Sequence, residues 1–163
     1  PPRSTLFPYT TLFRSVIQSL VYSHDDSVLD IGGSINLKGK ESSGEILSSV
    51  VSEGGEYKTV TEIVGAGDDS KGHIECNAVL LKNTANVETV PLLKAINTSV
   101  QLSHEASIVK ISKKEIEYLQ TKGLTEDDAR ELIVRGFVND SMKRMPESVQ
   151  EKIDGMISAG KGF

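Results

Sequence analysis

The residues best suited to chemistry in this sequence are a single cysteine and a histidine–glutamate pair. Cys76 is the only thiol and stands in the segment GHIECNAVLL, whereas His104 and Glu105 stand further on in SHEASIVK. A thiolate with an imidazole and a carboxylate is a ligand set for iron and other transition metals. The same residue types also serve a cysteine nucleophile activated by a histidine, so residue types alone leave both chemistries open.

The position of Cys76 argues against the nucleophile. Ile74, Ala78 and Leu80 alternate with it, which is the pattern of a strand with one buried face. Reactive thiols usually stand at a helix start or an exposed turn, where the thiolate is stabilised. A small buried hydrophobe and a metal or sulfur ligand therefore remain as alternatives for Cys76.

The other polar candidates also have ordinary structural interpretations. His104 shares its side of a strand with Val100 and Leu102, so a core histidine is the alternative to a ligand; Glu105 points the other way, as a solvated carboxylate would. His24 and His73 have polar neighbours, and we assign them no role. The clusters HDD, GDD and EDD lack the spaced ligands of a calcium loop and suit loops and helix starts.

These candidates lie in a region of alternating, strand-like segments that runs as far as about Ser112. No helical pattern interrupts them, which excludes βαβ units and leaves a sandwich, a barrel or a solenoid. Short, irregular spacing with small polar turn residues favours the solenoid. The segments are GSINLKG, EYKTVTEIVGAG, HIECNAVLL and SVQLSHEASIVKI.

A helical pattern follows Ser112. Ser112 and Glu115 form a capping box, and Gly123 supplies the stop of this first helix. Thr125 caps a second helix, and a third begins at Pro146. The expected inward-facing residues of the three helices are Ile116 and Leu119, then Ala129, Leu132, Ile133 and Phe137, then Val149, Ile153 and Met156.

The opening stretch PPRSTLFPYTTLFRS differs in character from the rest of the chain. It resembles the in-frame translation of a sequencing adapter, so we expect residues 1–15 to be non-native and the native sequence to start near Val16 as a C-terminal fragment. The expected division is a solenoid part over 16–111 and a helical subdomain over 112–163.

Composition narrows the class of protein further. A net charge of −5 argues against a nucleic-acid partner. No apolar run reaches the roughly 18 residues that span a membrane, and one cysteine allows no internal disulfide framework. We therefore expect a cytoplasmic protein.

The order of several motifs resembles the SufB/SufD family of iron–sulfur cluster assembly scaffolds. GHIECNAVLL is followed by VPLLKAINTSVQLSHEASIVKISKKEIEYLQTKGLTEDDARELIVRGFV, which has the cysteine strand, the VP turn, the SHEA segment and the YL and GL helical motifs of that family. The resemblance is clear over residues 72–138, and the SHEASI and GHIEC segments are more similar to SufB, specifically to archaeal or minimal versions.

The resemblance implies a right-handed parallel β-helix followed by a C-terminal helical subdomain. It implies that Cys76, His104 and Glu105 hold iron of a transient, nascent iron–sulfur cluster at a dimer interface, in a homodimer or a SufB–SufD-like heterodimer. It implies that the C-terminal helices bind a SufC-like ABC ATPase, and that the protein is a scaffold and not an enzyme. Two rivals remain: a carbohydrate-binding or carbohydrate-active solenoid, and a SufD-like structural partner that ligates no cluster.

Overall fold

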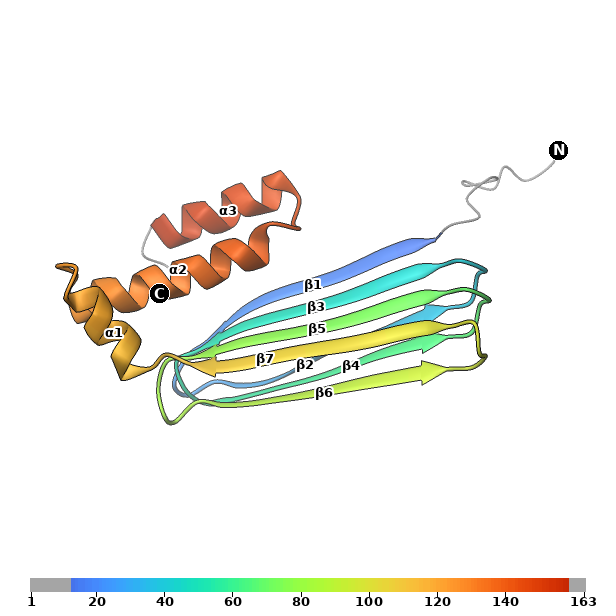
Figure 1. Ribbon diagram of the computed structural model, residues 1–163, viewed down its shortest axis with the longest axis horizontal. Coiled ribbons are helices and arrows are strands. Elements are labelled where there is room, and N and C mark those ends of the chain that lie inside the picture. Colours follow the sequence, from blue (N-terminus) through green and yellow to red (C-terminus); the bar gives the residue numbers. More distant parts are fainter. Residues whose placement is uncertain (1–12, 159–163) are drawn as a thin grey trace.

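The computed structural model describes residues 13–158 and consists of two parallel β-sheets followed by three helices (Figure 1). Sheet A has the strand order β1-β3-β5-β7 and sheet B the order β2-β4-β6. The strands are β1 (Arg14–Ser23), β2 (Val28–Leu37), β3 (Ser43–Ser52), β4 (Glu56–Gly65), β5 (Lys71–Leu80), β6 (Asn86–Ala95) and β7 (Gln101–Lys110).

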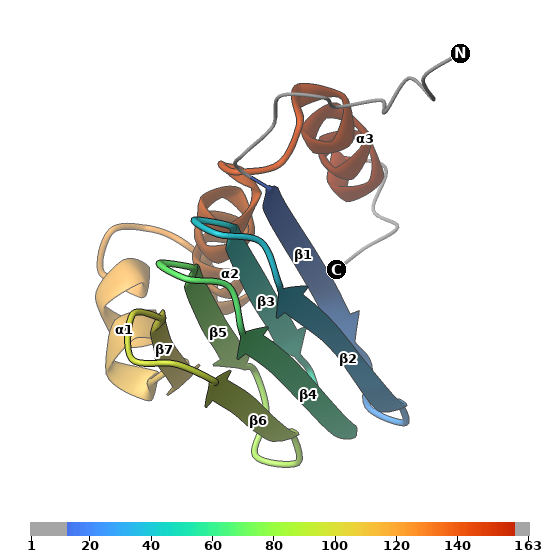
Figure 2. The same ribbon diagram turned by 90° about the vertical axis from the view of Figure 1, so that its right-hand side faces the viewer.

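Successive strands alternate between the two sheets, so the chain winds as a β-solenoid (Figure 2). Each strand pairs in parallel with the equivalent strand of the next coil; Ser43 pairs with Lys71, and Lys71 pairs with Gln101. Parallel strands of this kind need a crossover, which the other sheet provides here. The expected β-solenoid is therefore confirmed.

The core lies between the two sheets and follows the predicted alternation. Inward-facing aliphatic side chains stack from coil to coil, because register places equivalent positions side by side. One cluster of these residues contains Ile35, Leu37, Ile46, Ile63, Ile74 and Cys76. The interior also holds polar side chains: the hydroxyl groups of Ser48 and Tyr57 lie 3.2 Å apart in a hydrogen bond.

The three helices are α1 (Lys113–Gln120), α2 (Glu126–Met142) and α3 (Glu147–Ser158). Both capping boxes are present, since Ser112 pairs with Glu115 and Thr125 pairs with Asp128. Gly123 adopts a φ of +94°, which favours glycine and ends the first helical segment as expected.

Helices α2 and α3 pack on the outer side of sheet A, at the carboxyl ends of its strands (Figure 1). Val51 of β3 contacts the cluster of Val134, Val138 and Met142 from α2, with Phe137 beside them. The inward placement of Leu132 was wrong, because 52% of that side chain is exposed and Val134 and Val138 take the buried positions instead. Val149 and Met156 are also exposed, at 39% and 57%, so of the predicted α3 stripe Ile153 packs against the cluster.

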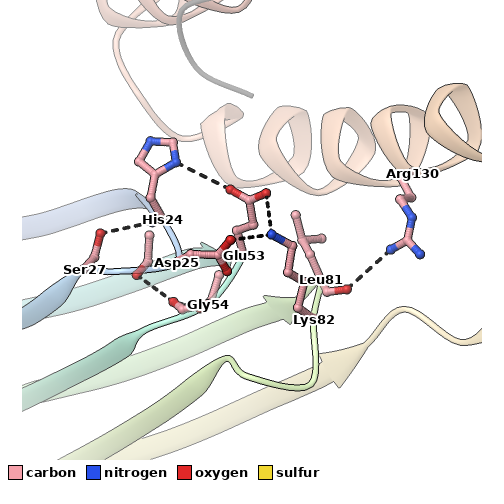
Figure 3. A network of polar contacts seen from close by, with 10 residues as sticks. His24, Asp25, Ser27, Glu53, Gly54, Leu81, Lys82 and Arg130 are labelled. Atoms are coloured by element: carbon pink, nitrogen blue, oxygen red, sulfur yellow. Dashed lines mark hydrogen bonds and ion pairs between the residues drawn. The ribbon is translucent and has the colours of Figure 1, made fainter.

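The turns that connect the two sheets also stack, and charged side chains link them (Figure 3). The Lys82 ammonium group lies 2.5 Å from an Asp25 carboxylate oxygen and 3.0 Å from a Glu53 oxygen, so one cation joins three successive turns. Arg130 of α2 donates to the carbonyl of Leu81 next to this group. The Lys82 ion pairs therefore link the turns to one another, and the Arg130 hydrogen bond links α2 to the turn after β5.

Strand β1 begins at Arg14, so the last two residues of the segment expected to be adapter-derived lie in a strand. Residues 1–12 and 159–163, which include most of that segment and the end of the expected helical subdomain, lie outside the described residues. Among the described residues, no helix has the length and apolar character that crossing a membrane requires.

Candidate functional site

Cys76 lies inside the solenoid, on the inner face of β5. Its side chain is 1% exposed and packs with Ile35, Ile63 and Ile74. Burial raises the pKa of the Cys76 thiol, and the neighbouring Glu75 carboxylate raises it further. The thiol is therefore held protonated at neutral pH, in the state that binds metal poorly.

A single strand, β7, lies between Cys76 on β5 and the edge of sheet A. Cys76 pairs in register with Ala106 of β7, and β7 is the edge strand of sheet A among the described residues. A methyl group is thus the side chain that lies next to the thiol in the stack. The helices cover the opposite face of this sheet, so they do not separate Cys76 from the open end of the solenoid.

His104 lies on the same inner side as Cys76, one strand nearer the edge. Its register partner is Ile74, whose side chain is fully buried, yet His104 itself is exposed because no further coil covers it. Strand and residue spacings place the Cβ atoms of Cys76 and His104 roughly 8 Å apart. The structure therefore brings two of the three predicted ligands to one face of one edge.

Glu105 lies on the other face of sheet A, as its position next to His104 in a strand requires. It pairs in register with Glu75, and its Oε1 lies 3.5 Å from Nε2 of His73. Within one chain, sheet A therefore separates Glu105 from Cys76. The predicted role of Glu105 as an iron ligand stays a prediction. If Glu105, Cys76 and His104 bind the same cluster, the cluster must lie at the edge of β7, where a second subunit can reach both faces of the sheet.

The outer face holds a group of three side chains, of which sequence reasoning assigned a role to Glu105 alone. His73, Glu75 and Glu105 each offer a ligand atom, and these atoms lie within 4.8 Å of one another. The signal was available in the alternation of residues 73 and 75 opposite Ile74 and Cys76. The sequence did not reveal the register in which β7 pairs with β5, and this register brings Glu105 next to His73 and Glu75.

The fold and the site together define a class of protein: a helix-flanked β-solenoid whose open end carries a cysteine and a histidine on its inner face. Residues 13–137 match the family model described as the SufBD core domain of the SUF system for iron–sulfur cluster assembly. The chain therefore belongs to the SufBD family, as the resemblance of its motifs predicted.

Curated proteins are similar over most of the chain. An iron–sulfur cluster assembly SufBD family protein of Archaeoglobus fulgidus is 40% identical over 144 residues, which are 88% of this chain and 38% of that protein. The corresponding protein of Methanothermobacter thermautotrophicus (strain Winter) is 35% identical over 145 residues, 88% of this chain and 35% of that protein. One from Staphylococcus epidermidis is 30% identical over 142 residues, 85% of this chain and 30% of that protein. The chain thus spans about a third of the length of these relatives.

Proposed function

We propose that this chain is part of a non-enzymatic scaffold on which iron–sulfur clusters are assembled, with Cys76 as the sulfur- or iron-binding thiol. The observation that carries the proposal is the placement of Cys76 and His104 on one inner face beside an open strand edge, in a SufBD family chain. The cluster is the cargo of the scaffold and is released after assembly. The relatives are iron–sulfur cluster assembly proteins by name, which supports this cargo.

A second subunit completes the site in this proposal. This region of the chain offers one thiolate, which is too few for a stable cluster, because such clusters are commonly held by four thiolates. Two chains that meet at their edges would pool two sets of ligands. The partner is an identical chain or a SufD-like one.

The edge of the solenoid has the properties of such an interface. Strands β6 and β7 are the outermost strands at this end, and each pairs on one side only among the described residues. An unpaired edge offers a row of backbone donors and acceptors to another chain. The exposed apolar side chains on these strands add contact area: Leu92, Leu93, Ile108 and Val109.

Burial of Cys76 suggests a role for a second kind of partner, an ATPase. A protonated, enclosed thiol binds iron poorly, so we propose that assembly passes through a state in which the end coil opens and the thiol ionises. We propose that a SufC-like ABC ATPase, bound to the C-terminal helices, shifts the population toward that open state. Exposed apolar residues on α1 and α2, Tyr118 and Leu132, are candidates for contact with it.

Anaerobic reconstitution of the full-length protein with ferrous iron and sulfide tests the role of Cys76. We expect Cys76→Ala to lose most acid-labile sulfide, while the matched core variant Ile63→Val retains it. Equal sulfide in wild type and Cys76→Ala would contradict the proposal and make Cys76 a structural residue, as in a SufD-like partner.

Co-purification of the full-length protein with a SufC-like ABC ATPase tests the role of the helices. Because Leu132 is exposed, Leu132→Asp is expected to leave the fold intact and to weaken the complex. Full retention of the ATPase by a folded Leu132→Asp variant would exclude this part of α2 as the docking surface.

A further inference from the structure

The outer face of sheet A carries a cluster of metal-ligand side chains that is separate from Cys76 and His104. His73 and Glu75 project from β5, and Glu105 projects from the adjacent edge strand β7. Their nearest ligand atoms all lie within 4.8 Å of one another. Sheet A separates this cluster from the thiol, since Ile74 and Cys76 alternate with its members and are buried on the inner side.

The two carboxylates of the cluster face each other without a spacer. Glu75 and Glu105 are register partners, so strand geometry brings their side chains to about 5 Å apart at Cβ. Like charges directly opposite in a sheet are destabilising. The ion pairs found for this cluster join Glu105 to His73, and among the described residues none joins either carboxylate to a lysine or an arginine. A bound cation would turn this repulsion into coordination.

Neighbouring groups orient two of the three ligands as they are oriented around bound metals. The Ser103 hydroxyl lies 2.8 Å from Nδ1 of His73, which leaves Nε2 facing the Glu105 carboxylate at 3.5 Å. The side-chain amide of Asn77 donates to Oε1 of Glu75 at 2.6 Å. Hydrogen bonds that fix the ring and the carboxylate from behind are typical of metal-ligating side chains.

The surroundings leave room for an ion and its waters. Glu75 and Asn77 line a cavity of about 240 Å³ between sheet A and α2, which Arg144 also lines. His73 lines the adjoining groove, and its side chain is 29% exposed. Glu105, at 68% exposed, lies on the edge strand and is free to adjust its oxygen positions.

From this geometry we propose that His73, Glu75 and Glu105 bind one divalent first-row transition ion, such as Zn²⁺, Mn²⁺ or Fe²⁺. One imidazole nitrogen with two carboxylates suits these ions better than Ca²⁺ or Mg²⁺, which prefer oxygen ligands alone. Three protein ligands leave open positions for water. The ion joins β7 to β5, so it fastens the edge strand to the solenoid. This inference does not depend on the scaffold function.

Titration of the full chain, without an affinity tag, with Zn²⁺ by calorimetry and with Co²⁺ by visible absorption tests the site. We expect one saturable site that His73→Ala and Glu75→Gln each weaken at least about tenfold. His24→Ala, an exposed imidazole at the turn after β1, and Glu62→Gln, on β4 of sheet B, are the matched controls and should bind as wild type does. No saturable binding, or equal loss in the His24→Ala or Glu62→Gln protein, would overturn the proposal.

Hydrogen exchange gives a second readout that does not rely on the variants alone. Saturating Zn²⁺ should slow exchange of the β7 amides in the wild type and raise its unfolding temperature, because the ion binds the folded state. Neither change should occur in the folded Glu75→Gln protein. The two proposals can fail independently of each other. Acid-labile sulfide in Cys76→Ala reports on the scaffold, whereas Zn²⁺ binding by Glu75→Gln reports on the outer cluster.

Discussion

The two faces of sheet A differ in the chemistry that they present, although the same strands supply both. On the inner face, Ile74 and Cys76 are enclosed by aliphatic side chains of the core. On the outer face, His73, Glu75 and Glu105 form a partly exposed polar cluster. Strand alternation therefore places a soft ligand, Cys76, in a dry environment and a hard ligand, the adjacent Glu75, in a wet one.

The outer face is itself divided along the strands. At the carboxyl ends, Val51 and its neighbours are covered by α2 and α3. Further toward the amino ends, the polar cluster does not pack against helix side chains among the described residues, and a cavity separates Glu75 from the end of α2. Helix packing thus accounts for the apolar half, and cation binding is our proposal for the polar half.

The largest difference between the faces should appear in unfolding free energy. Ile74→Ala removes a fully buried side chain from the inner face and should cost about 2–5 kcal/mol. Glu75→Gln, at the next residue, relieves a like-charge pair and should be neutral or slightly stabilising without metal. Urea unfolding measures both, and a cost below about 1 kcal/mol for Ile74→Ala would show that the inner face is not closely packed.

Substitutions in the apolar half of the outer face should have an intermediate effect on the free energy of unfolding. Val138 is 1% exposed against Val51, so Val138→Ala should cost about 2 kcal/mol from lost burial and a residual cavity. Leu132→Asp on the exposed side of α2 should change stability by about 0.5 kcal/mol or less. Similar losses for the two variants, measured by thermal unfolding, would mean that α2 packs through a different face.

A smaller effect on the free energy of unfolding is expected at Ser112, between the last strand of sheet A and α1. Ser112 accepts a hydrogen bond from the Glu115 amide, so Ser112→Ala should cost about 1 kcal/mol. Because hydrogen bonds from Ser112 lower the pKa of Glu115, this contribution is present above the ordinary glutamate range and is lost as the pH falls through the lowered value. Stability of Ser112→Ala should therefore depend less on acid than that of the wild type, and an unchanged acid profile would contradict the assignment.

The smallest expected effect on the free energy of unfolding comes from titration of the enclosed Cys76 thiol. Burial raises the pKa of Cys76 from 9.0, so the unfolded chain loses this proton first as the pH rises. Stability should fall above about that pH, and Cys76→Ala should lack this part of the decline. Denaturant unfolding at neutral and alkaline pH measures the difference, and identical alkaline profiles would indicate that the thiol is solvated in the folded state.

Alternation in the sequence predicted much of the solenoid because one face of most strands is exposed. Tyr57, Thr59 and Ile63 are buried as their period-two pattern indicates. Strand β3 was not identified, because its inner side contacts the core and its outer side contacts helices, so nearly the whole strand is buried and the alternation disappears. Strand β6 was obscured by Pro91, which an edge strand tolerates.

Strand alternation also predicted part of the candidate site. Parity in the strands correctly separated His104 from Glu105, and the family resemblance singled out Cys76. The partnership of Glu105 with His73 and Glu75 required the register between β5 and β7, which residue spacing across two turns does not determine. In α2, Ala129 is buried as predicted, but the prediction was wrong at Leu132. Val134, Val138 and Met142 form the face that packs against Val51 of sheet A, and the sequence pattern did not single them out.

Labelling of the one thiol in the folded protein tests the central claim most directly, which is that Cys76 is enclosed until the end coil opens. In the isolated wild-type chain at neutral pH, a thiol-reactive dye should label Cys76 on the order of 100-fold more slowly than in denaturant. Addition of the partner ATPase with nucleotide should accelerate labelling. Rapid labelling of the isolated folded chain, at the rate found in denaturant, would contradict the account.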